Sequence, residues 1–211
     1  MTTQTETKPR VRKRATTQTF HVPEGVKELD GERFEVTFPR QVNLGSKGMG
    51  DKLQCRIPTL GDRMTASTLA GPGADNEEVH AALVATCAEL APDDMDDLQL
   101  PQYLYLMQKF TEYTSGEDPA HYWQTLNDDG SYEVRLRYGL DTDGAVTKVV
   151  TMQPVTVGMR KKSSKAGNDV EREMKLFELC CNLTRDQIMS MRVWDYARLM
   201  ETLETFLASP T

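Results

Sequence analysis

Residues 83–110 read LVATCAELAPDDMDDLQLPQYLYLMQKF, and residues 176–203 read LFELCCNLTRDQIMSMRVWDYARLMETL. When the two stretches are aligned at one constant offset, seven of the 28 pairs are identical, well above the roughly 6% that average composition predicts. The identical pairs are Leu83/Leu176, Cys87/Cys180, Leu90/Leu183, Asp93/Asp186, Tyr103/Tyr196, Leu106/Leu199 and Met107/Met200. A shared apolar stripe would explain paired leucines and methionines, but not paired cysteine, aspartate and tyrosine. The alignment therefore predicts a structural unit that occurs twice.

Each of these helical stretches follows two segments in which apolar and polar residues alternate. Arg33–Phe38 and Lys52–Ile57 alternate around a glycine-rich loop, and Tyr132–Tyr138 and Val146–Met152 alternate around a turn. Alternation with period two is typical of half-buried strands, and two such runs around a short connection predict an antiparallel hairpin.

The helices are predicted from apolar residues spaced three and four apart and from end signals. Thr184 with Gln187 forms a capping-box pattern that predicts the start of a short helix. The expected helices cover about 76–90, a short segment beginning at Pro92, a segment beginning at Pro101, about 171–182, a short segment after Thr184, and about 193–207.

The fold class that follows is α+β, with two tandem similar units, each an antiparallel β-hairpin followed by about three α-helices. The expected divisions are a disordered basic tail at 1–20, a first unit at 32–114, a linker at 115–130 and a second unit at 131–209. Because a unit of this size has a thin core, we expect the two units to pack on each other or on a partner.

Composition narrows the function classes. The chain is 38% hydrophobic with a net charge of −7, and no apolar run approaches the roughly 20 residues of a membrane span. We therefore expect a cytoplasmic protein without a membrane partner. Five of the first 20 residues are Lys or Arg, so the tail could contact nucleic-acid phosphates, although a solvated tail is the favoured interpretation.

No residue pattern predicts catalysis, a cofactor or a metal ion. His21, His80 and His121 lack ligand spacing to each other or to a cysteine. Cys87 and Cys180 lie on apolar helical stripes, where a small buried side chain is expected. The acidic run at 93–97 could attract a cation, but it favours a solvated helix start.

The second unit resembles a known family. Its resemblance is carried by Met152–Val157, Gly167–Met174, Leu183-Thr184 and Trp194–Leu199. This pattern is similar to the tail assembly chaperones of Mu-like tailed phages over about residues 130–208. The first unit looks like a diverged copy, with Gln102-Tyr103 in place of Asp195-Tyr196.

The resemblance implies a chaperone that binds the helical tape measure protein and keeps its apolar segments soluble until tail tube subunits polymerise. It further implies a non-enzymatic protein of the host cytoplasm that is absent from the mature virion. Two alternatives stay open: a structural tail or baseplate component, and a nucleic-acid-associated regulator that uses the basic arm. Self-association also stays open.

Recognition would place an apolar client helix against apolar helix faces. The 11 methionines suit such a surface, although ordinary core packing also explains them. Met189 is expected to be exposed because its counterpart in the first unit is Asp96. The candidate partner-binding residues, expected at exposed apolar positions toward the end of each unit, are Met107, Phe110, Met189, Trp194, Met200 and Leu203.

Overall fold

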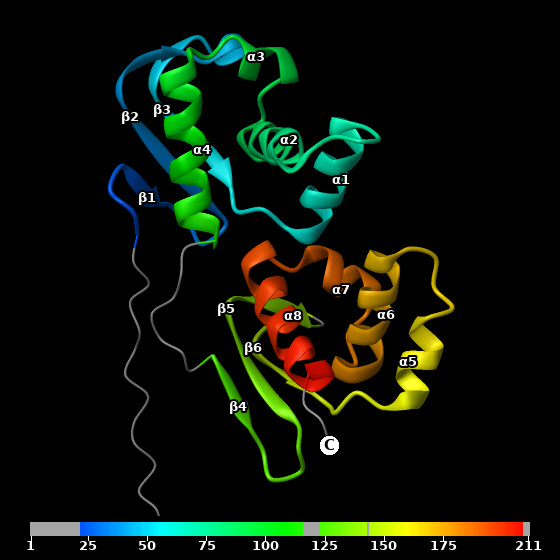
Figure 1. Ribbon diagram of the computed structural model, residues 1–211. Helices are drawn as coiled ribbons and strands as arrows, with labels where there is room; N and C mark the ends of the chain where they lie inside the picture. Colours follow the sequence, from blue (N-terminus) through cyan, green and yellow to red (C-terminus); the bar gives the residue numbers. More distant parts are fainter. Residues whose placement is uncertain (1–21, 116–122, 143, 209–211) are drawn as a thin grey trace, which may run out of the picture.

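Two small sheets, each covered by helices, lie one above the other in the computed structural model (Figure 1). The structure describes residues 22–115, 123–142 and 144–208. Both sheets are antiparallel and three-stranded, in the orders β1-β2-β3 and β4-β5-β6. The predicted α+β class and its two-unit arrangement are therefore confirmed in outline.

The first unit begins with its sheet. Its strands are β1 (Val26–Glu28), β2 (Arg33–Asn43) and β3 (Met49–Arg56), with a single 3-10 turn, η1 (Gly45–Lys47), between the last two. Its helices are α1 (Leu60–Ala70), α2 (Asn76–Ala88), α3 (Pro92–Asp96) and α4 (Leu100–Ser115).

The second unit repeats this order. Its strands are β4 (Gln124–Leu126), β5 (Tyr132–Thr142) and β6 (Ala145–Met152). Its helices are α5 (Val157–Ser163), α6 (Asp169–Cys181), α7 (Arg185–Ser190) and α8 (Val193–Ala208).

Strand register is also shared. Val36 lies opposite Val26 and Leu53, while Val134 lies opposite Gln124 and Val150. Each central strand then loses register with the strand that follows it, after Thr37 in one unit and after Arg135 in the other. Irregularities of this kind bend a sheet and re-aim its side chains, so both sheets curve at the same point.

Three details differ from the sequence predictions. Each hairpin gains a short third strand. In the second unit this strand, β4, occupies residues within the predicted linker at 115–130. The helix α1 was not predicted. A three-residue strand leaves no measurable periodicity, and α1 (LGDRMTASTLA) has only a weak apolar stripe. The predicted tail at 1–20 lies outside the described residues.

Helix ends follow local chemistry. The predicted capping box is present: Thr184 Oγ1 accepts from the Gln187 N–H at 3.2 Å, and Gln187 Oε1 accepts from the Thr184 N–H at 2.9 Å. Thr59 and Thr156 cap α1 and α5 with their hydroxyls. The helices α2 and α6 both end at a left-handed residue, Glu89 or Asn182, each with φ of 54°.

The last helix of each unit covers its sheet. Phe34 of β2 packs against α4, with ring centroids 5.6 Å from Phe110 and 4.4 Å from Tyr113. Cys87 and Cys180 are buried in the two cores, as predicted. Among the described residues, no helix is both long and apolar enough to cross a membrane.

Candidate functional site

The six predicted partner-binding residues do not form one surface. Phe110 and Leu203 are buried in the first and second cores, so the expectation that they are exposed is wrong. Both face their own sheet, because the apolar stripes of α4 and α8 supply the cores of these small units. Met107 and Met200 are half-buried against the same cores. Partner binding by these two methionines stays a prediction.

Trp194 and Met189 lie where the two units meet. Trp194 is buried beneath the Arg198 guanidinium, whose central carbon is 3.4 Å from the ring centroid. Met189 is half-buried rather than exposed, since the first turn of α1 approaches its backbone: a Cβ added at Gly61 would lie 3.2 Å from the Met189 carbonyl oxygen. Met189 therefore lies in the contact between the units. Trp194 is linked to the first unit through Arg137, whose guanidinium carbon is 5.7 Å from the Trp194 ring centroid and 5.3 Å from that of Tyr113.

A short antiparallel bridge forms this joint. The Leu60 N–H donates to the Met191 carbonyl at 2.9 Å, and the Val193 N–H donates to the Pro58 carbonyl at 2.9 Å. The Arg192 guanidinium also donates to the Ile57 carbonyl at 2.7 Å. Leu60 belongs to the second core although it begins the first helix of the first unit. The two units are therefore fastened by backbone pairing and by apolar burial.

Asp195 anchors the second sheet to α8. Its carboxylate accepts from the backbone N–H groups of Arg137, Tyr138 and Gly139 at 2.6, 3.0 and 3.3 Å, at the irregularity of β5. Burial raises the pKa of this carboxyl above its ordinary value, against the lowering effect of these donors and of Arg198. The Asp-Tyr pair on which the resemblance rests thus has a structural role on its aspartate side.

An open surface lies on the first unit between α1, α2 and α3. We call it the alanine groove; its lining residues are Leu69, Ala70, Glu78, Ala81, Ala82, Ala85, Thr86, Leu90, Met95 and Asp96. It has a volume of about 410 Å³. Leu69 stands at its edge with 63% of its surface exposed. The small side chains of α2 leave room for a helix to approach closely.

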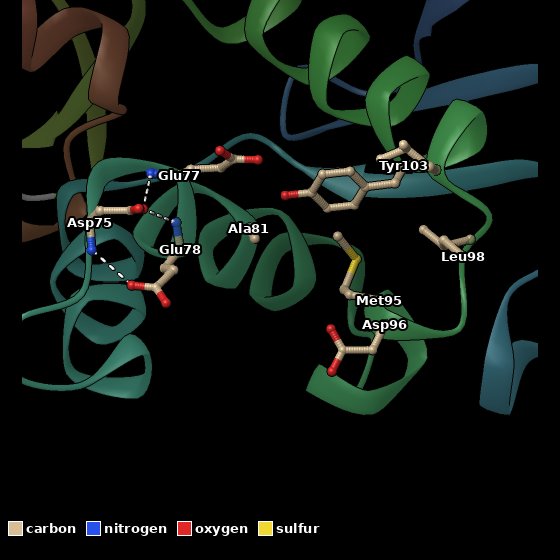
Figure 2. Close-up of a pocket in the computed structure, with 9 residues that line it drawn as sticks. Asp75, Glu77, Glu78, Ala81, Met95, Asp96, Leu98 and Tyr103 are labelled. Atoms are coloured by element: carbon tan, nitrogen blue, oxygen red, sulfur yellow. Dashed lines mark hydrogen bonds between the residues drawn. The ribbon is translucent and has the colours of Figure 1, made fainter.

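A second hollow, the acidic recess, adjoins the groove and shares Glu78, Ala81, Met95 and Asp96 with it. In Figure 2, Tyr103 of α4 points toward α2 above Met95 and Leu98. Asp75 caps α2 by accepting from the N–H groups of Glu77 and Glu78 at 2.8 and 2.9 Å. The recess therefore combines an apolar floor with four carboxylates, from Asp75, Glu77, Glu78 and Asp96.

Electrostatics in the recess favour a cation. The pKa of Tyr103 is raised, first by burial and then by the negative charges of Glu77, Asp75 and Asp96. Within the described residues, no group of three or more His, Cys, Asp or Glu side chains could hold a metal ion. Burial raises the pKa of the Cys55 and Cys87 thiols to about 12, so these thiols stay protonated and are poor nucleophiles at neutral pH. The surface is suited to binding a chain segment.

The acidic run at 93–97 has another explanation than a cation site. Asp94 accepts from the Ser46 N–H at 3.0 Å, from the Ser46 hydroxyl at 2.7 Å and from the Ala91 N–H at 3.0 Å. These bonds hold the tip of the first hairpin, near η1, against α3. They also lower the pKa of the Asp94 carboxyl below its ordinary value.

Sequence reasoning missed both hollows for one reason. The helix α1, which forms one wall of the groove, was not predicted, so the alanines of α2 had no visible partner across a gap. The signal that could have found the groove was the run of small residues at Ala81, Ala82, Ala85 and Ala88. A helix with a face of small side chains can pack tightly against its neighbours or leave a hollow beside them. The positions of the neighbouring helices determine which of the two occurs.

Comparisons with known proteins agree with the second unit. Residues 133–208 match the family model described as phage tail assembly chaperone proteins, E, or 41 or 14. Comparison with curated proteins and with solved structures finds no match. The matched residues run from β5 to the end of α8 and include Asp195 and its partners in β5. Residues 133–208, which form most of the second unit, are therefore similar to the family of phage tail assembly chaperone proteins.

Proposed function

We propose that this protein binds an apolar helical segment of the tape measure protein and keeps that protein soluble while the phage tail assembles. The family match over residues 133–208 supports the general role, and the open alanine groove is the observation that supports the mode of binding. The protein would act in the host cytoplasm without catalysis or a cofactor. It would be released as tail tube subunits polymerise, so the mature virion would lack it.

The alanine groove suits an amphipathic helix. Its floor of alanine, leucine and methionine side chains would cover the apolar face of such a helix, which is the helix-in-groove mode of recognition. Glu78 and Asp96 at its edges would favour lysine or arginine next to that apolar face. The client segment would therefore carry a stripe of large apolar residues flanked by basic ones.

We also propose that the two units arose by internal duplication. Their elements follow one order, their strands share register, and α2 and α6 end at equivalent left-handed residues. Two linked modules can engage one long client with more total affinity than either module alone. Modest affinity for each module would then still allow release.

Co-expression with the tape measure protein tests the proposal. The wild-type chain is expected to keep the client soluble and to co-purify with it. Ala82→Glu places a carboxylate on the apolar floor and is expected to leave the client insoluble. Leu69→Ala removes an exposed apolar contact with little effect on folding, and it is expected to weaken co-purification.

A matched control is Leu126→Glu, at a comparably exposed position of β4 in the second unit. This variant should behave as the wild type. Equal client solubility with Ala82→Glu and with the wild type would contradict binding in the groove. No effect of the wild-type chain on the client would contradict the function. Presence of the protein in purified virions would instead favour a structural component of the tail or baseplate.

A further inference from the structure

Each side of the joint between the two units has an exposed counterpart on the other unit. In the joint, Thr59-Leu60-Gly61 at the start of α1 contacts the corner between α7 and α8. The same three-residue pattern recurs as Thr156-Val157-Gly158 at the start of α5. Leu60 is 4% exposed whereas Val157 is 72% exposed. The second unit therefore offers the same docking element with nothing described against it.

Gly158 supports this equivalence. Gly61 leaves the space that brings α1 to within contact of the Met189 carbonyl, as described above. A Cβ added at Gly158 would meet only the Thr156 hydroxyl, at 3.7 Å, among the described residues. Packing inside the chain therefore does not require glycine at 158, but close approach of a second backbone would.

The receiving corner has its counterpart on the first unit. Met191, Arg192 and Val193 of the joint correspond to Leu98, Gln99 and Leu100, between α3 and α4. Val193 is half-buried in the joint, whereas Leu100 is 67% exposed. The Val193 N–H is bonded to Pro58, while the Leu100 N–H has no acceptor among the residues that the structure describes.

Charges at the two free ends are complementary. Two methionines of the joint, Met64 and Met189, correspond to Lys161 on α5 and to Asp96 at the acidic recess. Burial raises the pKa of Tyr196, and the positive charge of Arg63 across the joint partly opposes that effect. The counterparts of Arg63 and Tyr196 are Arg160 and Tyr103. Arg160, Lys161 and Lys162 are all exposed. A basic helix start thus matches a recess lined by four carboxylates.

The two units also share an aromatic contact between the last helix and the central strand. Tyr113 near the end of α4 lies 5.3 Å from the Arg137 guanidinium carbon, across the joint. Its counterpart, Phe206, packs on Tyr132 as Tyr113 packs on Phe34, with centroid distances of 5.0 and 4.4 Å. In the first unit, Pro39 corresponds to Arg137 and borders a third hollow of about 330 Å³. The residues that line this hollow are Phe38, Pro39, Arg40, Val42, Gln99, Pro101, Gln102 and Tyr105.

We propose that the start of α5 in one copy of this protein docks on the Leu98–Leu100 corner and acidic recess of a second copy, repeating the joint that already links the two units. The two units have the same orientation in Figure 1, with α3 and α7 at their upper ends. Repetition of the joint would therefore add copies head to tail and leave one free surface at each end. Such heterologous contacts extend until something blocks an end. The proposal does not depend on the identity of the client.

Sedimentation velocity of the full chain over a concentration series tests this proposal. The wild type is expected to exceed the mass of a dimer as concentration rises, and added salt is expected to weaken the association. Val157→Asp and Leu100→Asp each place a carboxylate on one side of the proposed contact between copies. Each is expected to weaken self-association at least about tenfold, which corresponds to roughly 1.4 kcal/mol.

Mixing the two variants gives the sharper result. Each variant keeps one intact side, so an equimolar mixture is expected to form dimers that cannot extend. Lys161→Asp should weaken association, and Asp96→Lys in the same chain should restore it. Leu104→Asp, on α4 but outside the lining of both hollows, is the matched control and should behave as the wild type.

Three outcomes would overturn the proposal. These are a wild type that stays monomeric at every concentration, a Val157→Asp variant that associates as strongly as the wild type, and a variant mixture without dimers. Val157 lies outside the alanine groove, so the Val157→Asp variant should still keep the client soluble. Loss of client binding and loss of self-association can therefore be told apart.

Discussion

The helices α2 and α6 occupy the same place in their units but carry side chains of different size. Ala81 and Val84 of α2 correspond to Met174 and Phe177 of α6, and both of these larger residues are buried in the second core. Ala81 lines the alanine groove, and the second unit carries the larger, buried Met174 at the equivalent position. One architecture can therefore be closed or open to a partner, depending on side-chain volume at a few positions.

The largest expected effect concerns how each unit holds its sheet. Asp195→Ala would leave three backbone N–H groups of β5 without their acceptor, so we expect a loss of about 4 kcal/mol in the free energy of unfolding. Gln102, its counterpart in the first unit, accepts from the Gln99 N–H at 3.2 Å and from no other group in the described part of the chain. Gln102→Ala should therefore cost less than about 1 kcal/mol. Urea denaturation of both variants measures the difference, and equal losses would contradict the anchoring role of Asp195.

The next comparison concerns the joint and its free counterpart. Leu60 is buried in the second core, so Leu60→Ala should destabilise the chain by about 3 kcal/mol. Val157→Ala, at the equivalent exposed position, should change stability by less than about 0.5 kcal/mol. Denaturation of the monomeric protein at low concentration separates folding from association. A large loss for Val157→Ala under these conditions would show that α5 is held differently from the structure described here.

A smaller effect is expected from closing the groove. Ala81→Met supplies the side chain that α6 carries at the equivalent position, and the groove has room for it. We expect stability to change by less than about 1 kcal/mol, whereas client binding should fall strongly. The measurement is co-purification of the tape measure protein alongside thermal unfolding of the variant. Unchanged co-purification would place the client elsewhere.

The smallest expected effect is a pH dependence confined to one unit. Bonds from Ser46 and the Ala91 N–H hold the pKa of Asp94 below its ordinary value of 3.8. The stabilisation is therefore complete above the pKa of the unfolded chain and disappears as the pH falls through the lower folded-state pKa. Gln187 accepts the equivalent bond in the second unit and does not titrate. Hydrogen exchange of the Ala91 and Thr184 amides should diverge on acidification, and Asp94→Asn should remove that divergence.

Much of the fold could be predicted from the sequence, because its signals are local. The capping box at Thr184, the alternation of β2 and β5 and the apolar stripe of α8 each depend on residues within a few positions of one another. The candidate surface could not be predicted in the same way. Phe110 and Leu203 are apolar helical residues like Met107 and Met200, and only the position of the sheets shows which of them are buried.

The sequence by itself determined that two similar helical units follow two strand pairs, because a repeated pattern at Cys, Asp and Tyr positions is visible without coordinates. Only the tertiary structure decided that Leu60 closes the core of the other unit while Val157 stays exposed. It also decided that the alanines of α2 face a hollow. The physical reason is that the burial of a residue depends on neighbours that are distant in the chain. These neighbours cannot be identified from the type of the residue or from the local spacing of apolar residues.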